Sequence, residues 1–167
     1  MAEKKTLIDG RKLKYSGLVN IKELLEKINE WLLEHNYEKE MRKTYEDVFE
    51  EGKETVIELA PFKIPAPYIR YRIRMYMTFR DLKEVCVEKG NLKTQMMKGD
   101  VNIIFDTYLE ADQENHWEGK PLFYFLRMIF DKYVYRLQNK QFEKDAVRDT
   151  LELEDNIKSY LNLQRYI

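Results

Sequence analysis

The chain has 167 residues, of which 44% are hydrophobic, and this length and composition fit one folded domain and exclude general disorder. Its 29 basic and 30 acidic side chains leave a net charge of -1, which excludes a general attraction to nucleic acid or to an anionic membrane, so such a partner would need a local patch. The single cysteine, Cys86, excludes an internal disulfide and a metal site built from cysteines.

No signal-peptide pattern follows Met1, and no apolar run approaches the roughly 18 residues that span a bilayer. We therefore expect a cytoplasmic protein that is not an integral membrane protein, folded as a single domain over residues 1–167.

The N-terminal part predicts a strand followed by a helix. A turn signal, Asp9-Gly10, predicts a short strand or hairpin within the first sixteen residues. Asn20 is a suitable helix cap, with Glu23 three residues later and Val19 placed to pack on Leu24. Apolar residues then recur at helical spacing up to a stop at His35-Asn36; they are Ile21, Leu24, Leu25, Ile28, Trp31 and Leu32.

The central part predicts strands. Residues 37–49 change to a two-residue period, residues 50–53 resemble a turn, and residues 55–62 resemble a strand that ends at Pro65-Ala66-Pro67. Residues 69–80 form the clearest strand, because the odd-numbered positions are apolar and four of the even-numbered positions are arginines.

Two glycines suggest how the following strands connect. If Lys89-Gly90 and Lys98-Gly99 are two-residue hairpin turns, Val87 faces Leu92 and Met96 faces Val101, so that one side of three strands is apolar. A further turn at residues 80–82 would place Met75 opposite Val87. These turns predict a six-strand antiparallel meander.

The C-terminal part predicts helices. A polar loop at residues 112–118 precedes a largely apolar helix over residues 121–133, and residues 138–140 either break or kink it. A long amphipathic helix then runs to about Arg165, with one side formed by Phe142, Ala146, Asp149, Leu153, Ile157, Tyr160 and Leu161. The expected class is α+β, with the meander packed against the N-terminal helix and the long C-terminal helices.

This order of elements resembles the helix-grip architecture of the START-like (Bet v1-like) superfamily. The resemblance implies a strongly curved sheet that wraps the long C-terminal helix, with space between them that often holds an apolar ligand. Residues 6–17 and 121–133 are also similar to small uncharacterised archaeal proteins, a similarity that implies no function.

An interior ligand pocket is the first candidate site. Flexible methionines and aromatic rings suit an adaptable apolar site, although the same pattern is the ordinary core of a sheet. The predicted lining residues are Tyr71, Met75, Met77, Phe79, Met96 and Phe105 from the sheet and Phe125, Ile129 and Tyr133 from the helix.

The arginine strand is the second candidate site. Arg70, Arg72 and Arg74, flanked by Tyr68 and Tyr76, form a basic and aromatic ladder of the kind that binds RNA. The alternative is that these arginines pair across strands with Glu58, Glu84 or Glu88, which would neutralise the ladder.

Other chemistry finds less support in the sequence. Asp112, Glu114 and His116 are better explained as a solvated loop than as a metal site, and no motif indicates a catalytic nucleophile or a cofactor. Apolar residues outside the main helical stripes allow a homo-oligomer or a partner surface formed by the C-terminal helices; these are Tyr124, Phe130, Tyr135, Leu151 and Leu163.

The leading functional hypothesis is a non-enzymatic binding protein of START-like shape that engages an apolar small molecule or a protein partner. The alternative is an RNA- or ribosome-associated factor that uses the arginine strand. An enzyme whose site assembles without sequence motifs is the third, less favoured option.

Overall fold

The computed structural model describes residues 3–49, 52–66, 69–89, 92–111 and 135–164. Its elements are β1 (Glu3–Val19), α1 (Ile21–Glu34), β2 (Met41–Phe49), β3 (Gly52–Leu59), β4 (Phe62–Ala66), β5 (Ile69–Lys89), β6 (Leu92–Ala111) and α3 (Tyr135–Gln164). The six strands form one antiparallel sheet in the order β1-β6-β5-β3-β2, with β4 paired to β5 beside this path. The predicted α+β class with a six-strand antiparallel sheet is confirmed.

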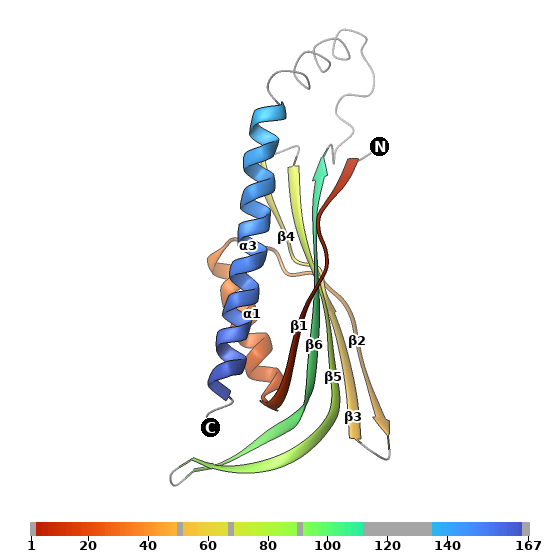
Figure 1. Ribbon diagram of the computed structural model, residues 1–167, viewed down its shortest axis with the longest axis vertical. Coiled ribbons are helices and arrows are strands. Elements are labelled where there is room, and N and C mark those ends of the chain that lie inside the picture. The colour runs from red at the N-terminus through yellow and green to blue at the C-terminus, as the bar shows by residue number, and fades with distance from the viewer. Residues whose placement is uncertain (1–2, 50–51, 67–68, 90–91, 112–134, 165–167) are drawn as a thin grey trace.

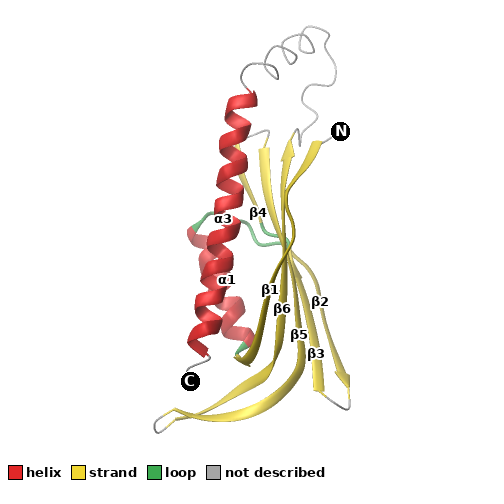
Figure 2. Ribbon diagram, in the orientation of Figure 1, coloured by secondary structure: helices red, strands yellow, loops and turns green. Residues whose placement is uncertain are grey.

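Both described helices lie on the same face of the sheet. In Figure 1, α3 runs along the length of the sheet and α1 lies beside it, while the opposite face carries no described helix. Figure 2 shows the resulting two layers, one of strands and one of helices. The first strand, β1, is an edge strand and lies next to the last strand, β6. Helix α3 contacts both of these strands.

Strand β1 corrects the predicted short strand or hairpin at the N-terminus. It is continuous for 17 residues and pairs with β6 along its length. Asp9-Gly10 lies at a register shift within this strand, where Gly10 adopts a φ of 61° and its backbone N donates to Asp106 Oδ1 at 2.7 Å. The turn signal thus marks a β-bulge, in which glycine supplies the left-handed conformation.

The predicted first helix is confirmed as α1. The Asn20 side chain accepts a hydrogen bond from the Glu23 backbone N at 3.3 Å, and the helix ends at His35. Leu24, Ile28 and Trp31 are buried on the face that packs into the core. Cap, spacing and stop signal agree here because all three act within one short segment.

The region of β2, β3 and β4 is close to the prediction. Tyr45 pairs with Val56 in the β2–β3 hairpin, whose connection at residues 50–51 lies outside the described residues. The predicted strand at 55–62 is divided between β3 and β4, and β4 includes Pro65. The β4–β5 register shifts between Lys63 and Ala66, around this proline, as expected for a residue that cannot donate to a ladder.

Strands β5 and β6 correct the predicted meander. Each is about 20 residues long, and they pair with each other from end to end. Lys98-Gly99 is not a turn but part of β6, and Met75 pairs with Phe105 instead of facing Val87. The one connection lies between Lys89 and Leu92, one residue later than predicted, at residues outside the described set.

The predicted turn at residues 80–82 is a β-bulge. Arg80 pairs with Asp100 and Lys83 with Lys98, so Asp81 and Leu82 together stand opposite Gly99. Asp81 has a φ of 53°, and a Cβ atom on Gly99 would lie 2.5 Å from the Arg80 backbone O. Gly99 is therefore required for close backbone approach, and the β5–β6 arm bends towards the helices beyond this point (Figure 1).

The core lies between the sheet and the two helices. The odd-numbered apolar positions of residues 69–79 are all buried, as the alternation predicts, and they pack with α1 and α3. The predicted stripe of α3 is confirmed, since its members are buried or packed on the core. Residues 138–140 lie within a continuous α3, whereas the predicted helix at 121–133 lies outside the described residues.

Candidate functional site

Five of the predicted pocket residues belong to the core. Tyr71, Met75, Met77, Phe79 and Phe105 are at most 2% exposed and pack in one cluster with side chains of α1 and α3. The three predicted helical lining residues, Phe125, Ile129 and Tyr133, lie outside the described residues. These contacts fit the ordinary core reading, and the interior ligand pocket stays a prediction.

The predicted position of Met96 is corrected. Met96 is only 7% exposed, but its side chain does not lie on the helix-facing side of the sheet with the other five. Phe105 and Met97 lie at alternate positions of a strand whose register against β1 is regular, and Met97 packs on the core. Met96 therefore points to the opposite side of the sheet, where it pairs with Val85. The predicted turn at Lys98-Gly99 would have reversed the chain and brought Met96 to the core side.

The arginine ladder is neutralised by acidic neighbours. Arg72 Nη1 lies 2.5 Å from Glu40 Oε2, and Arg72 Nε donates to Glu110 Oε1 at 3.2 Å. Arg74 Nε donates to Glu58 Oε1 at 2.8 Å, and Arg70 lies 3.9 Å from Glu110.

Ion pairing was the predicted alternative to RNA binding. Glu58 is a partner as predicted, whereas Arg72 pairs with Glu40 and Glu110 and not with Glu84 among the described side chains; the side chain of Glu88 lies outside them. Tyr76 is half-buried, with its hydroxyl 3.4 Å from that of Tyr45, and Tyr68 lies outside the described residues. The RNA hypothesis stays a prediction that the charge pairing does not favour.

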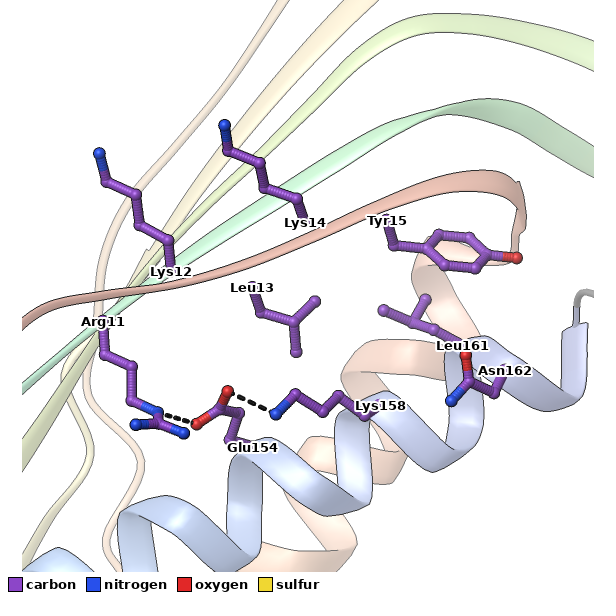
Figure 3. A pocket seen from close by; sticks show the side chains of 9 residues that line it. All are labelled: Arg11, Lys12, Leu13, Lys14, Tyr15, Glu154, Lys158, Leu161 and Asn162. Atoms are coloured by element: carbon purple, nitrogen blue, oxygen red, sulfur yellow. Dashed lines mark hydrogen bonds and ion pairs between the residues drawn. The ribbon is translucent and has the colours of Figure 1, made fainter.

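A pocket that the sequence did not predict lies between β1 and α3. Its volume is about 420 Å³. The lining residues come from one continuous stretch of β1 and from one side of α3; they are Arg11, Lys12, Leu13, Lys14, Tyr15, Glu154, Lys158, Leu161 and Asn162 (Figure 3).

The pocket has an apolar floor and a polar rim. In Figure 3, Leu13, Tyr15 and Leu161 point into the space between the strand and the helix, and the Arg11 and Lys158 side chains converge on Glu154 at one end. Lys12 and Lys14 point away from the helix, to the other face of the sheet, so they border the pocket mainly through the strand itself.

Glu154 connects the strand to the helix. It is 2% exposed, accepts a hydrogen bond from Arg11 Nε, and lies 2.7 Å from Lys158 Nζ. Burial alone would raise the pKa of the Glu154 carboxyl, but the hydrogen bonds from Lys158 and Arg11 outweigh it and lower that pKa below its usual value. Two half-exposed cations thus share one buried carboxylate, and Lys158 Nζ also lies 3.6 Å from Asp155 Oδ1, so that the charges at the pocket rim are balanced.

The edge of β1 beside this pocket has no strand partner in the described part of the chain. β1 is the last strand of the sheet order and pairs with β6 on one side only. Alternate residues of such a strand present backbone N–H and C=O groups outward, ready to pair with another strand. The pocket therefore lies beside an open strand edge, and we call the pocket together with the adjoining edge of β1 the β1–α3 groove.

A second polar cluster is buried between α1, β4, β5 and α3. The Tyr37 hydroxyl donates to Asp149 Oδ2 at 3.0 Å, and both residues are 3% exposed. Lys63 Nζ lies 3.9 Å from the same oxygen and Arg148 lies 3.5 Å from Asp149 Oδ1. Burial, followed by the charge and hydrogen bond of Asp149, raises the pKa of Tyr37. Because Tyr37 and Asp149 are buried and hydrogen-bonded to each other, this cluster has a structural role.

Reactive groups are sparse in the residues that the structure describes. Within these residues, no three His, Cys, Asp or Glu side chains are grouped so that they could hold a metal ion, and the predicted loop with His116 lies outside them. No described helix combines the length and the apolar character needed to cross a membrane. Comparisons of the chain with protein-family models, with curated proteins and with solved structures returned no match.

One sequence signal could have identified the strand that borders the groove. Residues 12–15 alternate basic and apolar side chains, with Leu13 and Tyr15 on one side and Lys12 and Lys14 on the other. That pattern predicts a half-buried strand. It does not predict that the strand lies at a sheet edge, because edge position depends on partners far away in the chain.

Proposed function

We propose that the protein is a non-enzymatic binding protein, and that it binds an extended segment of a protein partner, which adds to the sheet as a further strand beside β1. The observation that carries this proposal is the open edge of a 17-residue strand next to a pocket of about 420 Å³. Strand addition uses backbone hydrogen bonds for affinity and side-chain pockets for specificity, and the groove supplies both.

The groove can receive such a segment on both of its faces. A strand paired with β1 places alternate side chains towards the α3 flank, opposite Leu13 and Tyr15, and the others towards the outer face, opposite Lys12 and Lys14. The α3 flank restricts the space on the inner side, since Glu154 and Leu161 border it. The size of the inward side chains is therefore restricted.

The pairing of the first strand with the last, together with a long C-terminal helix over the same face, supports a helix-grip-like architecture of the START-like type. An apolar ligand between sheet and helix finds less support, because Met75, Phe79 and Phe105 are 0% exposed. The protein-partner branch of the hypothesis is the one that the groove favours. We also propose the cytoplasm as its location and a single domain as its organisation.

The experiment uses a strand-forming peptide of about eight residues with alternating threonine and valine, and follows the backbone amides of the protein by NMR. The expected result is that amides of β1 near Lys12 and Lys14 shift and exchange more slowly, while those of the other edge strand, β2, stay unchanged. Methyl groups on alternate peptide nitrogens that face β1 should abolish the effect, and methyl groups on the remaining nitrogens should leave it intact.

The methylated pair separates strand addition from other contacts with the same surface. Equal binding of both methylated peptides, or changes confined to β2, would contradict strand addition at β1. No binding by any of the extended peptides, neutral or charged, would reject the proposed function altogether.

A further inference from the structure

The open edge of β1 is strongly basic. Its residues 3–19 contain five basic side chains, Lys4, Lys5, Arg11, Lys12 and Lys14, against two acidic ones, Glu3 and Asp9. The chain as a whole has a net charge of -1, so this excess is local to the strand. A local patch of one sign is what a charged partner would need.

The cations of β1 differ in how far they are already satisfied. Lys5 pairs with Glu143, and the Lys4 ammonium lies 3.6 Å from the centre of the Tyr108 ring. Arg11 shares the carboxylate of Glu154 with Lys158.

Lys12 and Lys14 differ from these, because among the residues that the structure describes neither of them has an ion-pair partner. Both are exposed, and they are two residues apart on the same outer face. Positive charge without a counter-charge therefore lies along the part of β1 that borders the pocket.

We propose that the segment bound at β1 alternates acidic and apolar residues, with carboxylates opposite Lys12 and Lys14 and apolar side chains opposite Leu13 and Tyr15. This inference rests on the proposed function, because it requires the segment to pair with β1. Residues directly opposite each other in a sheet lie about 5 Å apart at Cβ, so opposite charges at these positions attract and like charges repel. The pattern of the partner is the complement of residues 12–15.

The same charges disfavour a second copy of this chain as the occupant through β1, in every register that places its basic residues opposite one another. Pairing two β1 strands brings their lysines and arginines onto one ladder, where like charges destabilise the pairing. Lysines on an edge strand also prevent unwanted strand pairing in many proteins. That protective role predicts no preference for an acidic peptide over a neutral one, so binding measurements distinguish the two roles.

The test compares three peptides of about eight residues that alternate valine with glutamate, threonine or lysine. Fluorescence anisotropy should give the tightest binding for the glutamate peptide, and raising sodium chloride from about 0.05 M to about 0.5 M should weaken it by about tenfold. The double substitution Lys12→Gln, Lys14→Gln should weaken it by about two- to thirtyfold, the range expected for two exposed ion pairs. It should leave the threonine peptide unaffected.

A matched control and a charge reversal complete the design. Lys39→Gln with Lys43→Gln removes two exposed lysines at and just before the opposite edge strand, β2, and should leave all three affinities unchanged. Lys12→Glu with Lys14→Glu should reverse the preference, so that the lysine peptide binds better than the glutamate peptide. Thermal unfolding of each variant verifies that the fold is retained.

Three results would overturn the inference. Equal affinity for the glutamate and threonine peptides, without salt dependence, would reject the acidic partner while leaving strand addition in place. Displacement of the glutamate peptide by free glutarate at the same carboxylate concentration would identify a site for small anions instead. An equal loss of affinity in the Lys39, Lys43 control would show that net charge, not the β1 edge, determines binding.

Discussion

The substitution Tyr37→Phe removes one hydroxyl from the buried cluster between α1 and α3 and should destabilise the fold measurably. That hydroxyl donates to Asp149 Oδ2 at 3.0 Å, and both side chains are almost completely buried. A hydrogen bond to a charged group contributes about 1.5–3 kcal/mol to stability. Asp149 keeps Lys63 and Arg148 as neighbours after the change, so the loss should stay within this range.

Urea unfolding followed by circular dichroism measures the free energy of unfolding of each variant. For a chain of this size, a loss of about 1.5–3 kcal/mol corresponds to a melting temperature about 3–12 °C lower. A double-mutant cycle with Asp149→Asn isolates the pair, and its coupling energy should be about 1 kcal/mol or more. Tyr45→Phe, at a tyrosine that is 46% exposed, is the control and should change the free energy by less than about 0.5 kcal/mol.

The result that would refute this reasoning is a Tyr37→Phe variant within about 0.5 kcal/mol of the parent protein, or a coupling energy near zero. Either outcome would mean that Asp149 is satisfied by its basic neighbours alone.

Three further predictions concern the core, the bulge and alkaline pH. Phe105→Ala, at a fully buried ring, should lower the free energy of unfolding by about 3–5 kcal/mol, whereas Met41→Ala, at a residue 53% exposed, should change it little; equal effects in urea titrations would contradict the core assignment. Gly99→Ala should cost about 1–3 kcal/mol by thermal unfolding, because the added Cβ meets the Arg80 backbone O, and an unchanged melting temperature would argue against the close approach. Burial raises the pKa values of Tyr37, Tyr71 and Tyr160. Above about pH 10 the unfolded chain releases these hydroxyl protons while the folded protein keeps them, so the urea midpoint of unfolding should fall as the pH rises. The fall should be less steep in the Tyr160→Phe variant.

Elements determined by short-range signals were predictable from the sequence. The cap at Asn20, the stripe of α1 and the alternation of residues 69–79 each depend on side chains within a few turns or pleats, and the structure confirms them. The buried side of α3 was predictable for the same reason.

Glycine signals were ambiguous, because glycine serves turns, bulges and close approaches alike. Gly10 needs its left-handed φ next to Asp106, and Gly99 needs its missing Cβ opposite Arg80, yet these partners are 96 and 19 residues away in sequence. A local pattern does not contain them. For this reason the turns predicted at Asp9-Gly10 and Lys98-Gly99 were wrong, and the second of them led to the wrong face for Met96.

The candidate site was missed for a related reason. Residues 12–15 show the alternation of a half-buried strand, but only the pairing of β1 with β6 places that strand at the end of the sheet. The ion pairs of the arginine ladder also depend on the sheet order, since Arg72 meets Glu40 and Glu110 from two different segments. Tertiary neighbours decide which charges remain available.

The extra residue at Asp81-Leu82 divides the long β5–β6 hairpin into a proximal and a distal part, in which odd-numbered side chains of β5 point to opposite faces. Before it, odd-numbered side chains such as Met75 face the helices; beyond it, Val85 is odd-numbered too but projects from the reverse side, with Met96 as its partner. Deletion of this single residue would reverse the facing of every β5 side chain in the distal part and would exchange its apolar and polar faces. The orientation of the distal part thus depends on the number of residues at the bulge. Substitutions that change only side chains leave that number, and therefore the orientation, unchanged.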